Sequence, residues 1–379
     1  MNYSILKYVL GYVLKIEAEF MLLPCVTSLI YHEKEGRYFF LVACVCMLLG
    51  VLMTYRKPKN TVFYLKEGCL ATSLSWIILS LFGAIPFWIS GEIPRWEDAL
   101  FETISGFTTT GATILGDVEA LSHTALIWRS FTHWIGGMGV LVFLLAILPL
   151  SGGSSINLMK AESPGPSVGK LVPKVRYTAM ILYTIYFGMT VIEFIFLLAG
   201  KMPLFDALTT AFGTAGTGGF GIKNDSMMGY SPYIQWVVAI FMILFGINFN
   251  FYFYIIYRHF RKAVSMEEIH YYLAMILIAV TIIFLNIRAM YPTGFEAMTH
   301  SVFQVASLAT STGFSTTDFD LWPQTSQTIL IIVMFVGACA GSTGGGIKVS
   351  RIVILFKTVL KELNSYIHPK SVRKINVEG

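Results

Sequence analysis

The sequence predicts an all-α polytopic membrane protein, and three observations lead to this fold class. Of its 379 residues, 55% are hydrophobic and 13% are charged, and the mean hydropathy is +0.67. Soluble domains carry about 25% charged residues, so this chain has too little charge to cover a water-exposed surface. Long apolar stretches recur along the chain, and basic residues gather in alternate connecting segments. A cytosolic enzyme and a nucleic-acid-binding module are therefore excluded as first interpretations.

Eight apolar stretches are long enough to be spanning helices, since a helix needs about 20 residues to cross a bilayer. They cover roughly residues 7–31, 37–55, 68–91, 124–150, 175–200, 232–257, 270–291 and 325–340, the last continuing across several glycines to about 363. Three further segments have a helical pattern but only about 10–14 residues, which is too short to span. These segments, near 97–107, 204–213 and 296–309, are expected to be re-entrant or buried helices.

The basic residues predict the orientation of the chain. The three loops that contain the short segments hold only Arg95, Lys201 and Lys223. Most of the other Lys and Arg residues lie in the alternate segments, at Arg56, Lys57, Lys59, Lys66, Lys160, Lys170, Lys174, Arg176, Arg258, Arg261, Lys262, Lys348, Arg351, Lys357, Lys361, Lys370, Arg373 and Lys374. The positive-inside rule places these alternate segments and both termini in the cytoplasm, with the short helices toward the opposite face.

One pattern occurs three times: a spanning helix, a short helix, a Gly/Thr-rich turn and a second spanning helix. When the segments that begin at Ala99, Ala207 and Ser301 are aligned, each has glycine at its thirteenth position. The repeats lie about 95–110 residues apart, which is too long for a solenoid, and repeated membrane units are typical of transport proteins. The predicted domains are an N-terminal helix pair (1–60) and three pore units (61–155, 156–265 and 266–379).

The Thr-Gly turns have the chemistry of a cation site. A short helix directs the negative end of its dipole toward the turn that follows it, and glycine allows the positive φ that such a turn requires. Rings of backbone carbonyls can replace the hydration shell of K⁺. The alternative is that the glycines only allow helices to pack closely. Three turns in register, each after a short helix, favour the cation site.

The turns and several other motifs resemble those of the bacterial Trk/Ktr potassium-uptake family, nearer its Trk branch (TrkH-type). The motifs are Phe107–Thr113, Trp128–Gly139, Glu162–Pro166, Thr214–Phe220, Gly246–Phe249, Ser311–Thr316 and Gly341–Lys348. The resemblance implies helix–pore loop–helix units around a central K⁺ pathway. It places the filter carbonyls, and with them the bound potassium, at Thr110, Gly111, Gly218, Gly219, Thr312 and Gly313.

The resemblance also implies partners and location. We expect K⁺ uptake across the cell inner (cytoplasmic) membrane by a lipid-embedded homodimer. A cytosolic nucleotide-binding regulatory ring is the expected protein partner, and neither an organic cofactor nor nucleic acid is expected. No residue favours H⁺ or Na⁺ symport over channel-like flow. The family has four pore units, whereas this sequence has three, so the chain is expected to be a fragment or split product, or to receive a fourth unit from another chain.

The spacing of Gly341 and Gly346 before Lys348 is similar to that of a phosphate-binding P-loop. A P-loop, however, has Lys and then Ser or Thr directly after its second glycine and follows a strand, and this segment has neither feature. Gly341, Gly344, Gly345 and Gly346 instead interrupt a membrane helix. The resemblance implies that this segment is an intramembrane gating loop with Lys348 at its cytoplasmic edge. A passive kink is the alternative.

Four ionisable residues within the apolar segments are candidates for function by default. Arg129 and His133 share one helix face, where a snorkelling Arg and a hydrogen-bonded His are the plainer interpretation. Glu102 is expected to anchor the pore loop or to place a charge at its entrance, and Glu193 to face protein.

Two other functions remain open from the sequence alone. An intramembrane enzyme would use Ser342 or His133 beside an adjacent base, but the threefold repeat has no role in it, and no known catalytic motif is present. A non-conducting chain that needs a separate fourth pore unit is the other alternative. No catalytic residue is therefore assigned.

Overall fold

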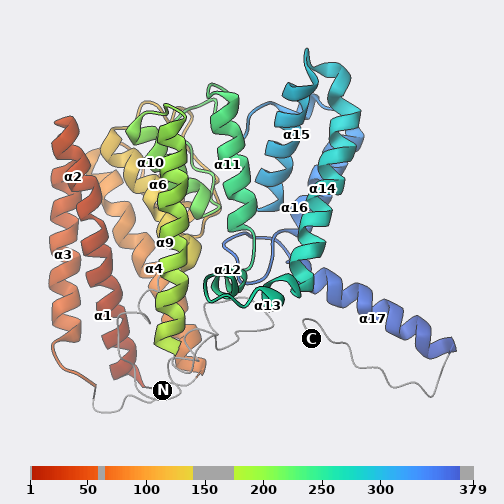
Figure 1. Cartoon of the computed structure of the whole chain (residues 1–379). Helices are drawn as coiled ribbons and strands as arrows, with labels where there is room; N and C mark the ends of the chain where they lie inside the picture. Colours follow the sequence, from red (N-terminus) through yellow and green to blue (C-terminus); the bar gives the residue numbers. More distant parts are fainter. Residues whose placement is uncertain (1, 59–64, 140–174, 368–379) are drawn as a thin grey trace. The chain divides into compact units, whose positions relative to one another are not determined.

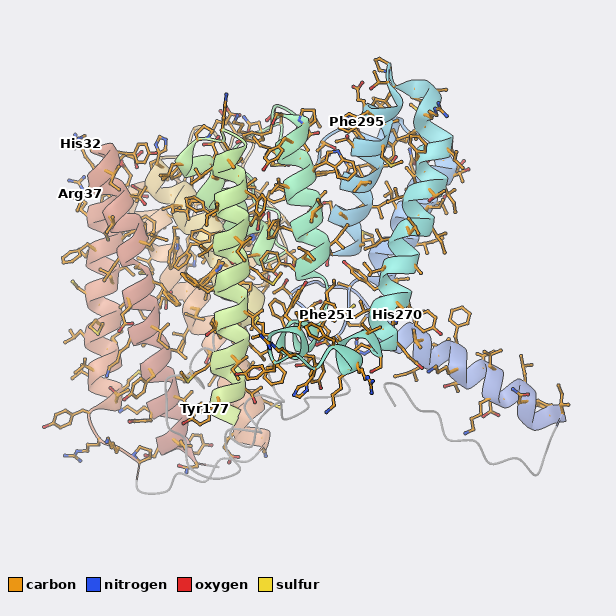
Figure 2. The ribbon with its side chains drawn as sticks, viewed as in Figure 1. His32, Arg37, Tyr177, Phe251, His270 and Phe295 are labelled. Carbon is orange, nitrogen blue, oxygen red and sulfur yellow. The ribbon has the colours of Figure 1, made fainter. Side chains whose placement is uncertain are left out.

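The computed structural model describes residues 2–58, 65–139 and 175–367, and all regular elements in these ranges are helices (Figure 1). The predicted all-α fold class is confirmed. Within these described ranges, four helices are long and apolar enough to cross a membrane, at Gly36–Thr54, Lys66–Ser90, Tyr177–Ala199 and Glu267–Met290. Large apolar side chains project outward from them, for example Tyr177 (Figure 2). The chain forms two compact units, Met1–Ser226 and Met227–Gly379, which are described separately.

The first unit begins with α1 (Tyr3–Phe20), α2 (Leu22–Tyr31) and α3 (Gly36–Thr54). The prediction of one helix over 7–31 is wrong, because α1 ends and α2 begins around Met21. Pro24 explains the interruption, since proline has no N–H to donate to the preceding turn. α1 packs along α3, where Gly11 and Gly50 allow close approach: a Cβ at Gly50 would lie 2.7 Å from the Gly11 carbonyl oxygen.

The rest of the first unit surrounds two short helices. It consists of α4 (Leu65–Ser90), α5 (Trp96–Phe107), α6 (His123–Met138), α9 (Val175–Ala199) and α10 (Leu204–Ala215). The short helices α5 and α10 lie where the sequence predicts them, and α6 packs against both. The second half of the predicted 124–150 span and the Glu162–Pro166 motif lie outside the described residues, as do Lys59, Lys160, Lys170, Lys174, Lys370, Arg373 and Lys374.

The N-terminus of α6 is capped by a side chain from the loop between α2 and α3. The Glu33 carboxylate accepts hydrogen bonds from the amides of His123 and Thr124, both at 2.9 Å, and from the Thr124 hydroxyl at 2.6 Å. The Ser122 hydroxyl accepts from the next amide. These bonds satisfy donors that a helix leaves without partners at its start. Burial alone would raise the pKa of Glu33, but the hydrogen bonds from Thr124 and His123 lower it below its ordinary value of 4.5.

Replacing Glu33 with glutamine is expected to lower the free energy of unfolding at neutral pH by about 1–3 kcal/mol, because α6 loses a charged acceptor. Since the folded-state pKa is depressed, the stabilisation is present above about pH 4.5 and is lost as the pH falls through the folded-state pKa. Thermal unfolding in detergent at several pH values measures this effect. The two melting temperatures should converge in acid. A Glu97→Gln control, at an exposed position, should behave like the unmodified chain.

The second unit contains α11 (Pro232–Phe245), α12 (Phe249–Ile256), α13 (Phe260–Val264), α14 (Glu267–Ile287), α15 (Gly294–Ala309), α16 (Gln324–Val336) and α17 (Val349–Ile367), with 3₁₀ turns at Arg288–Met290 and Phe319–Leu321. The third short helix, α15, packs against α11, α14 and α16 (Figure 1). It lies at the predicted 296–309 segment.

Two predicted spans of the second unit differ in the structure. The prediction of one helix over 232–257 is wrong, because the chain bends by 91° between α11 and α12. The Asn248 side chain accepts from the Asn250 amide, so it caps a new helix where the old one ends. The predicted continuation of a span to residue 363 is also wrong. α17 carries Arg351, Lys357 and Lys361 and is not apolar enough to cross a membrane.

Candidate functional site

The turns that follow the three short helices have the same hydrogen-bond pattern. In each turn, which we call a pore turn (residues 108–111, 216–219 and 310–313), one amide donates to the carbonyl five residues before it. The bonds join Thr110 to Ser105 (2.9 Å), Gly218 to Gly213 (3.0 Å) and Thr312 to Ser307 (2.8 Å). This bond defines a Schellman helix end. The sequence repeat is thus also a backbone repeat, present in both units.

The pore turns also share their left-handed residues. The glycine at the thirteenth position of each repeat has a positive φ, at Gly111 (74°), Gly219 (77°) and Gly313 (88°). Two residues earlier, a non-glycine residue is left-handed as well, at Thr109 (54°), Thr217 (50°) and Ser311 (55°). Such φ values are uncommon for any residue except glycine, and most of all for a β-branched residue such as threonine. Their recurrence shows that one unusual backbone conformation is specified three times.

Hydroxyl groups pair in the same way in the first and third pore turns. The Thr108 and Thr110 hydroxyls are 2.8 Å apart, and those of Thr310 and Thr312 are 2.7 Å apart. In both turns the pair joins the residue that caps the short helix to a predicted filter residue. These hydrogen bonds restrict the rotation of the threonine side chains beside the left-handed glycine.

A buried ion pair holds the loops that follow the first two pore turns. Glu102 on α5 and Arg129 on α6 are 1% and 3% exposed, and the Arg129 Nε lies 2.5 Å from the Glu102 carboxylate. The carboxylate also accepts from the Thr113 hydroxyl (2.9 Å) and the Ile114 amide (3.1 Å). The expectation that Glu102 anchors the pore loop is confirmed.

Arg129 extends from this pair to the second loop. Its guanidinium donates to the Gly221 carbonyl (2.7 Å) and lies 3.7 Å from the centre of the Phe220 ring, a cation–π distance. The prediction that Arg129 snorkels is wrong, because the side chain ends in a buried network rather than at a membrane surface. One helix, α6, thereby positions two loops at once.

His133 lies behind the second pore turn. Its ring stacks on Phe220 at 4.1 Å, and its Nδ1 accepts from the Phe220 amide at 3.4 Å. A Cβ at Gly218 would lie 2.2 Å from Nδ1, so only glycine fits there. The hydrogen-bonded interpretation of His133 is confirmed. Glu193 is fully buried in α9, in agreement with the expectation that it faces protein.

The segment between α16 and α17, which we call the Gly-rich loop (residues 337–348), folds back on itself. The amides of Ile347 and Lys348 donate to carbonyls at the end of α16, at 3.1 and 2.9 Å. Gly337 and Gly346 both have positive φ, and a Cβ on Gly346 would lie 2.5 Å from the Gly337 Cα. The predicted break in the helix is confirmed, and its glycines are required by this close crossing.

The Gly-rich loop contacts both the third pore turn and the bend between α11 and α12. The Gly345 amide donates to the Ser311 hydroxyl (2.7 Å). The Cys339 amide donates to the Gly246 carbonyl, and the Gly341 carbonyl accepts from the Phe249 amide, both at 3.0 Å. Two interrupted helices of the second unit are therefore joined at their interruptions.

Lys348, the last residue of the Gly-rich loop, is buried. It is 6% exposed, and its ammonium group donates back to the Gly344 carbonyl. Glu268, near the start of α14, was not identified from the sequence. Its carboxylate accepts from the Ala340 and Ser350 amides. An acidic residue in the first turn of a spanning helix, directly after a basic segment, is the only signal that the sequence contains for it.

Ser342 has no catalytic arrangement. Its hydroxyl donates to the Cys339 carbonyl at 2.6 Å, so its proton is directed to an amide oxygen that cannot act as a base. Among the residues that the structure describes, no group of three or more His, Cys, Asp or Glu side chains could hold a metal ion.

The chain is similar in sequence and in fold to known cation transport proteins. The TrkH family model, described as a cation transport protein, matches residues 36–379. The Trk system potassium uptake protein TrkH of Salmonella typhimurium is 35% identical over 387 residues, covering 100% of this chain and 80% of that protein. TrkG of Escherichia coli is 32% identical, covering 99% and 79%. The crystal structure of the potassium transporter TrkH from Vibrio parahaemolyticus superposes with a TM-score of 0.87 at 30% identity, covering 100% of this chain and 80% of that one.

Proposed function

Because the chain belongs to the TrkH family of cation transport proteins, we propose that it provides a pathway for K⁺ uptake across the cytoplasmic membrane. The named relatives are potassium uptake proteins, and the family consists of transporters rather than enzymes. The observation that carries the proposal is the recurrence of one backbone conformation, with a left-handed glycine, in all three pore turns.

In this proposal the pore turns form the selectivity filter. Backbone carbonyls at Thr110, Gly111, Gly218, Gly219, Thr312 and Gly313 replace the water around K⁺, which is the transported ion and needs no organic cofactor. The Schellman bonds and the Glu102–Arg129 pair support this role, because a filter must keep its carbonyls at fixed separations while ions pass. The basic segments support a multi-pass topology with both termini in the cytoplasm.

The Gly-rich loop is the proposed gate, with Gly341, Gly344, Gly345, Gly346 and Lys348 as its defining residues. Its contact with Ser311 supports this role, because the loop lies directly beside the third pore turn.

Homodimer formation and docking on a cytosolic nucleotide-binding ring complete the proposal. Light scattering of the purified chain in detergent tests the first, and co-purification with such a ring tests the second.

Flux of ⁸⁶Rb⁺ into liposomes that contain the chain tests the proposed function. Uptake that K⁺ inhibits and that Na⁺ does not inhibit is the expected result. No uptake by correctly inserted protein would favour the alternative, a non-conducting chain that requires a separate fourth pore unit.

Replacing Gly344, Gly345 and Gly346 with alanine is expected to raise ion flux severalfold with little change in selectivity. Added Cβ atoms at the first two would lie 2.5 Å from the Ala338 Cβ and 2.4 Å from the Ser311 hydroxyl, so the loop must move. Each alanine also favours helix over loop by about 1 kcal/mol. ⁸⁶Rb⁺ flux measures the change.

The matched control is Gly188→Ala on α9, where an added Cβ meets nothing within 4 Å. Its flux should equal that of the unmodified chain. Unaltered or reduced flux in the triple variant would contradict the gate and support the passive kink.

A further inference from the structure

We propose that Glu268 is a positioning residue that holds the Gly-rich loop closed and couples the loop to α17. The proposal rests on the gating role proposed above for the Gly-rich loop. It assigns the control of that loop to a side chain on a different helix, α14.

The carboxylate of Glu268 connects the Gly-rich loop to the helix that follows it, α17. Its Oε1 atom accepts from the Ala340 amide at 2.7 Å and from the Ser350 amide at 3.0 Å. Ala340 lies within the loop, and Ser350 is the second residue of α17. A single oxygen atom therefore fixes the first part of the loop, at Ala340, relative to the start of α17.

The site is built to keep this charge buried. Glu268 is only 2% exposed, so its carboxylate depends on protein donors in place of water. The N-terminal amides of α17 have no partners within their own helix, and the helix dipole favours a negative charge there. The buried ammonium group of Lys348 is also attracted to Glu268. Hydrogen bonds to an ionised acceptor are about twice as strong as neutral ones.

The neighbouring residue, Glu267, also contacts α17. Glu267 forms an ion pair with Lys357, which lies about two turns beyond Ser350 on α17, and both side chains are partly exposed. The first turn of α14 thus holds α17 through two side chains, Glu267 and Glu268. Glu268 also bonds to the loop, through the Ala340 amide. A movement of α17 that carries Ser350 away from α14 would weaken the hold on Ala340 as well, and the loop would be released.

Cys339 provides a natural reporter for this release. It lies in the Gly-rich loop next to Ala340 and is fully buried. The test uses the full chain in membrane vesicles, with Cys25, Cys44, Cys46 and Cys69 replaced by alanine, and measures the rate at which a small methanethiosulfonate reagent modifies Cys339. Glu268→Ala should raise this rate at least about tenfold, because two charge-assisted hydrogen bonds are lost.

Three further variants separate the proposed role from a general loss of structure. Glu267→Ala removes the adjacent charge and should leave the rate within about twofold of the unmodified chain. Glu268→Gln keeps an acceptor oxygen without the charge and should give an intermediate rate. Ser350→Pro removes one donor and leaves the carboxylate in place, since proline is tolerated in the first turn of a helix; its rate should also rise. Size-exclusion chromatography of each variant in detergent shows whether it is folded, because a misfolded variant elutes differently from the unmodified chain.

The outcomes distinguish this proposal from the gate itself. Suppose that Cys339 is modified no faster in Glu268→Ala and Ser350→Pro than in Glu267→Ala, while it is modified quickly in the triple glycine variant. The role of Glu268 is then overturned and the gate stands. If Glu268→Ala exposes Cys339 and raises ⁸⁶Rb⁺ flux, both are supported. If it exposes Cys339 while neither it nor the triple glycine variant changes flux, Glu268 holds the loop, and the loop is not the gate.

Discussion

Replacing Arg129 with methionine is expected to destabilise the chain by about 3–5 kcal/mol, because it leaves the Glu102 carboxylate buried without a partner. The same change frees the loop that Arg129 holds through the Gly221 carbonyl and the Phe220 ring. Discrimination between K⁺ and Na⁺ should therefore fall together with stability. Thermal unfolding in detergent and the ratio of ⁸⁶Rb⁺ to ²²Na⁺ flux measure the two effects.

A double variant shows whether the unpaired charge is the cause. Arg129→Met combined with Glu102→Gln removes both charges, so most of the lost stability should return. Selectivity should stay low, because the bond to Gly221 is still missing. Arg95→Met is the matched control, since Arg95 pairs with Asp98 at 3.9 Å while 75% exposed. Exposed pairs contribute at most about 1 kcal/mol. An Arg129→Met chain as stable as this control would contradict the prediction.

Serine at Gly111, Gly219 or Gly313 is expected to lower the K⁺ over Na⁺ flux ratio by about tenfold at each position. A side chain in the left-handed region costs about 1–2 kcal/mol, and the turn can avoid this cost only by rotating the carbonyls proposed to bind K⁺. Gly313 is the cleanest case, because an added Cβ would meet nothing within 4 Å and only the backbone conformation is affected.

Gly116→Ser controls for the addition of a side chain to the loop after the first pore turn. An added Cβ there also meets nothing within 4 Å, and its φ is not positive. Its flux ratio should not change. Unchanged ratios in all three filter variants, measured in protein that still transports ions, would refute the filter assignment and favour glycines that serve only helix packing.

The pore turns and the Gly-rich loop were predictable because their signals are local. A short helix has too few residues to span, and a Gly-Thr pattern at a fixed position marks its end. Four glycines within six residues likewise disfavour helix wherever they occur. The repeat added a second, independent signal, because coincidence of three such turns in register is rare. The assignment of these residues to K⁺ binding and gating stays a prediction.

Other features were not predictable because they depend on residues far apart in the sequence. The bend between α11 and α12 falls in a continuous apolar run, and it is stabilised by bonds to the Gly-rich loop almost 100 residues later. Glu102 and Arg129 each look like an isolated charge until the fold brings them together. α17 was assigned to a membrane span by its apolar residues, although its three basic side chains make it amphipathic.

The residue that caps α6 is synthesised well before α6 itself. Glu33 precedes α6 by about 90 residues, and chains emerge from the ribosome N-terminus first. The loop between α2 and α3 is therefore already synthesised when α6 appears, and its carboxylate is available for the first amides of that helix. The N-terminal helices therefore carry a cap that is made before the helix that positions Arg129 and His133. Removing them would deprive α6 of its cap at the moment of insertion, even though they contribute no residue to the pore turns.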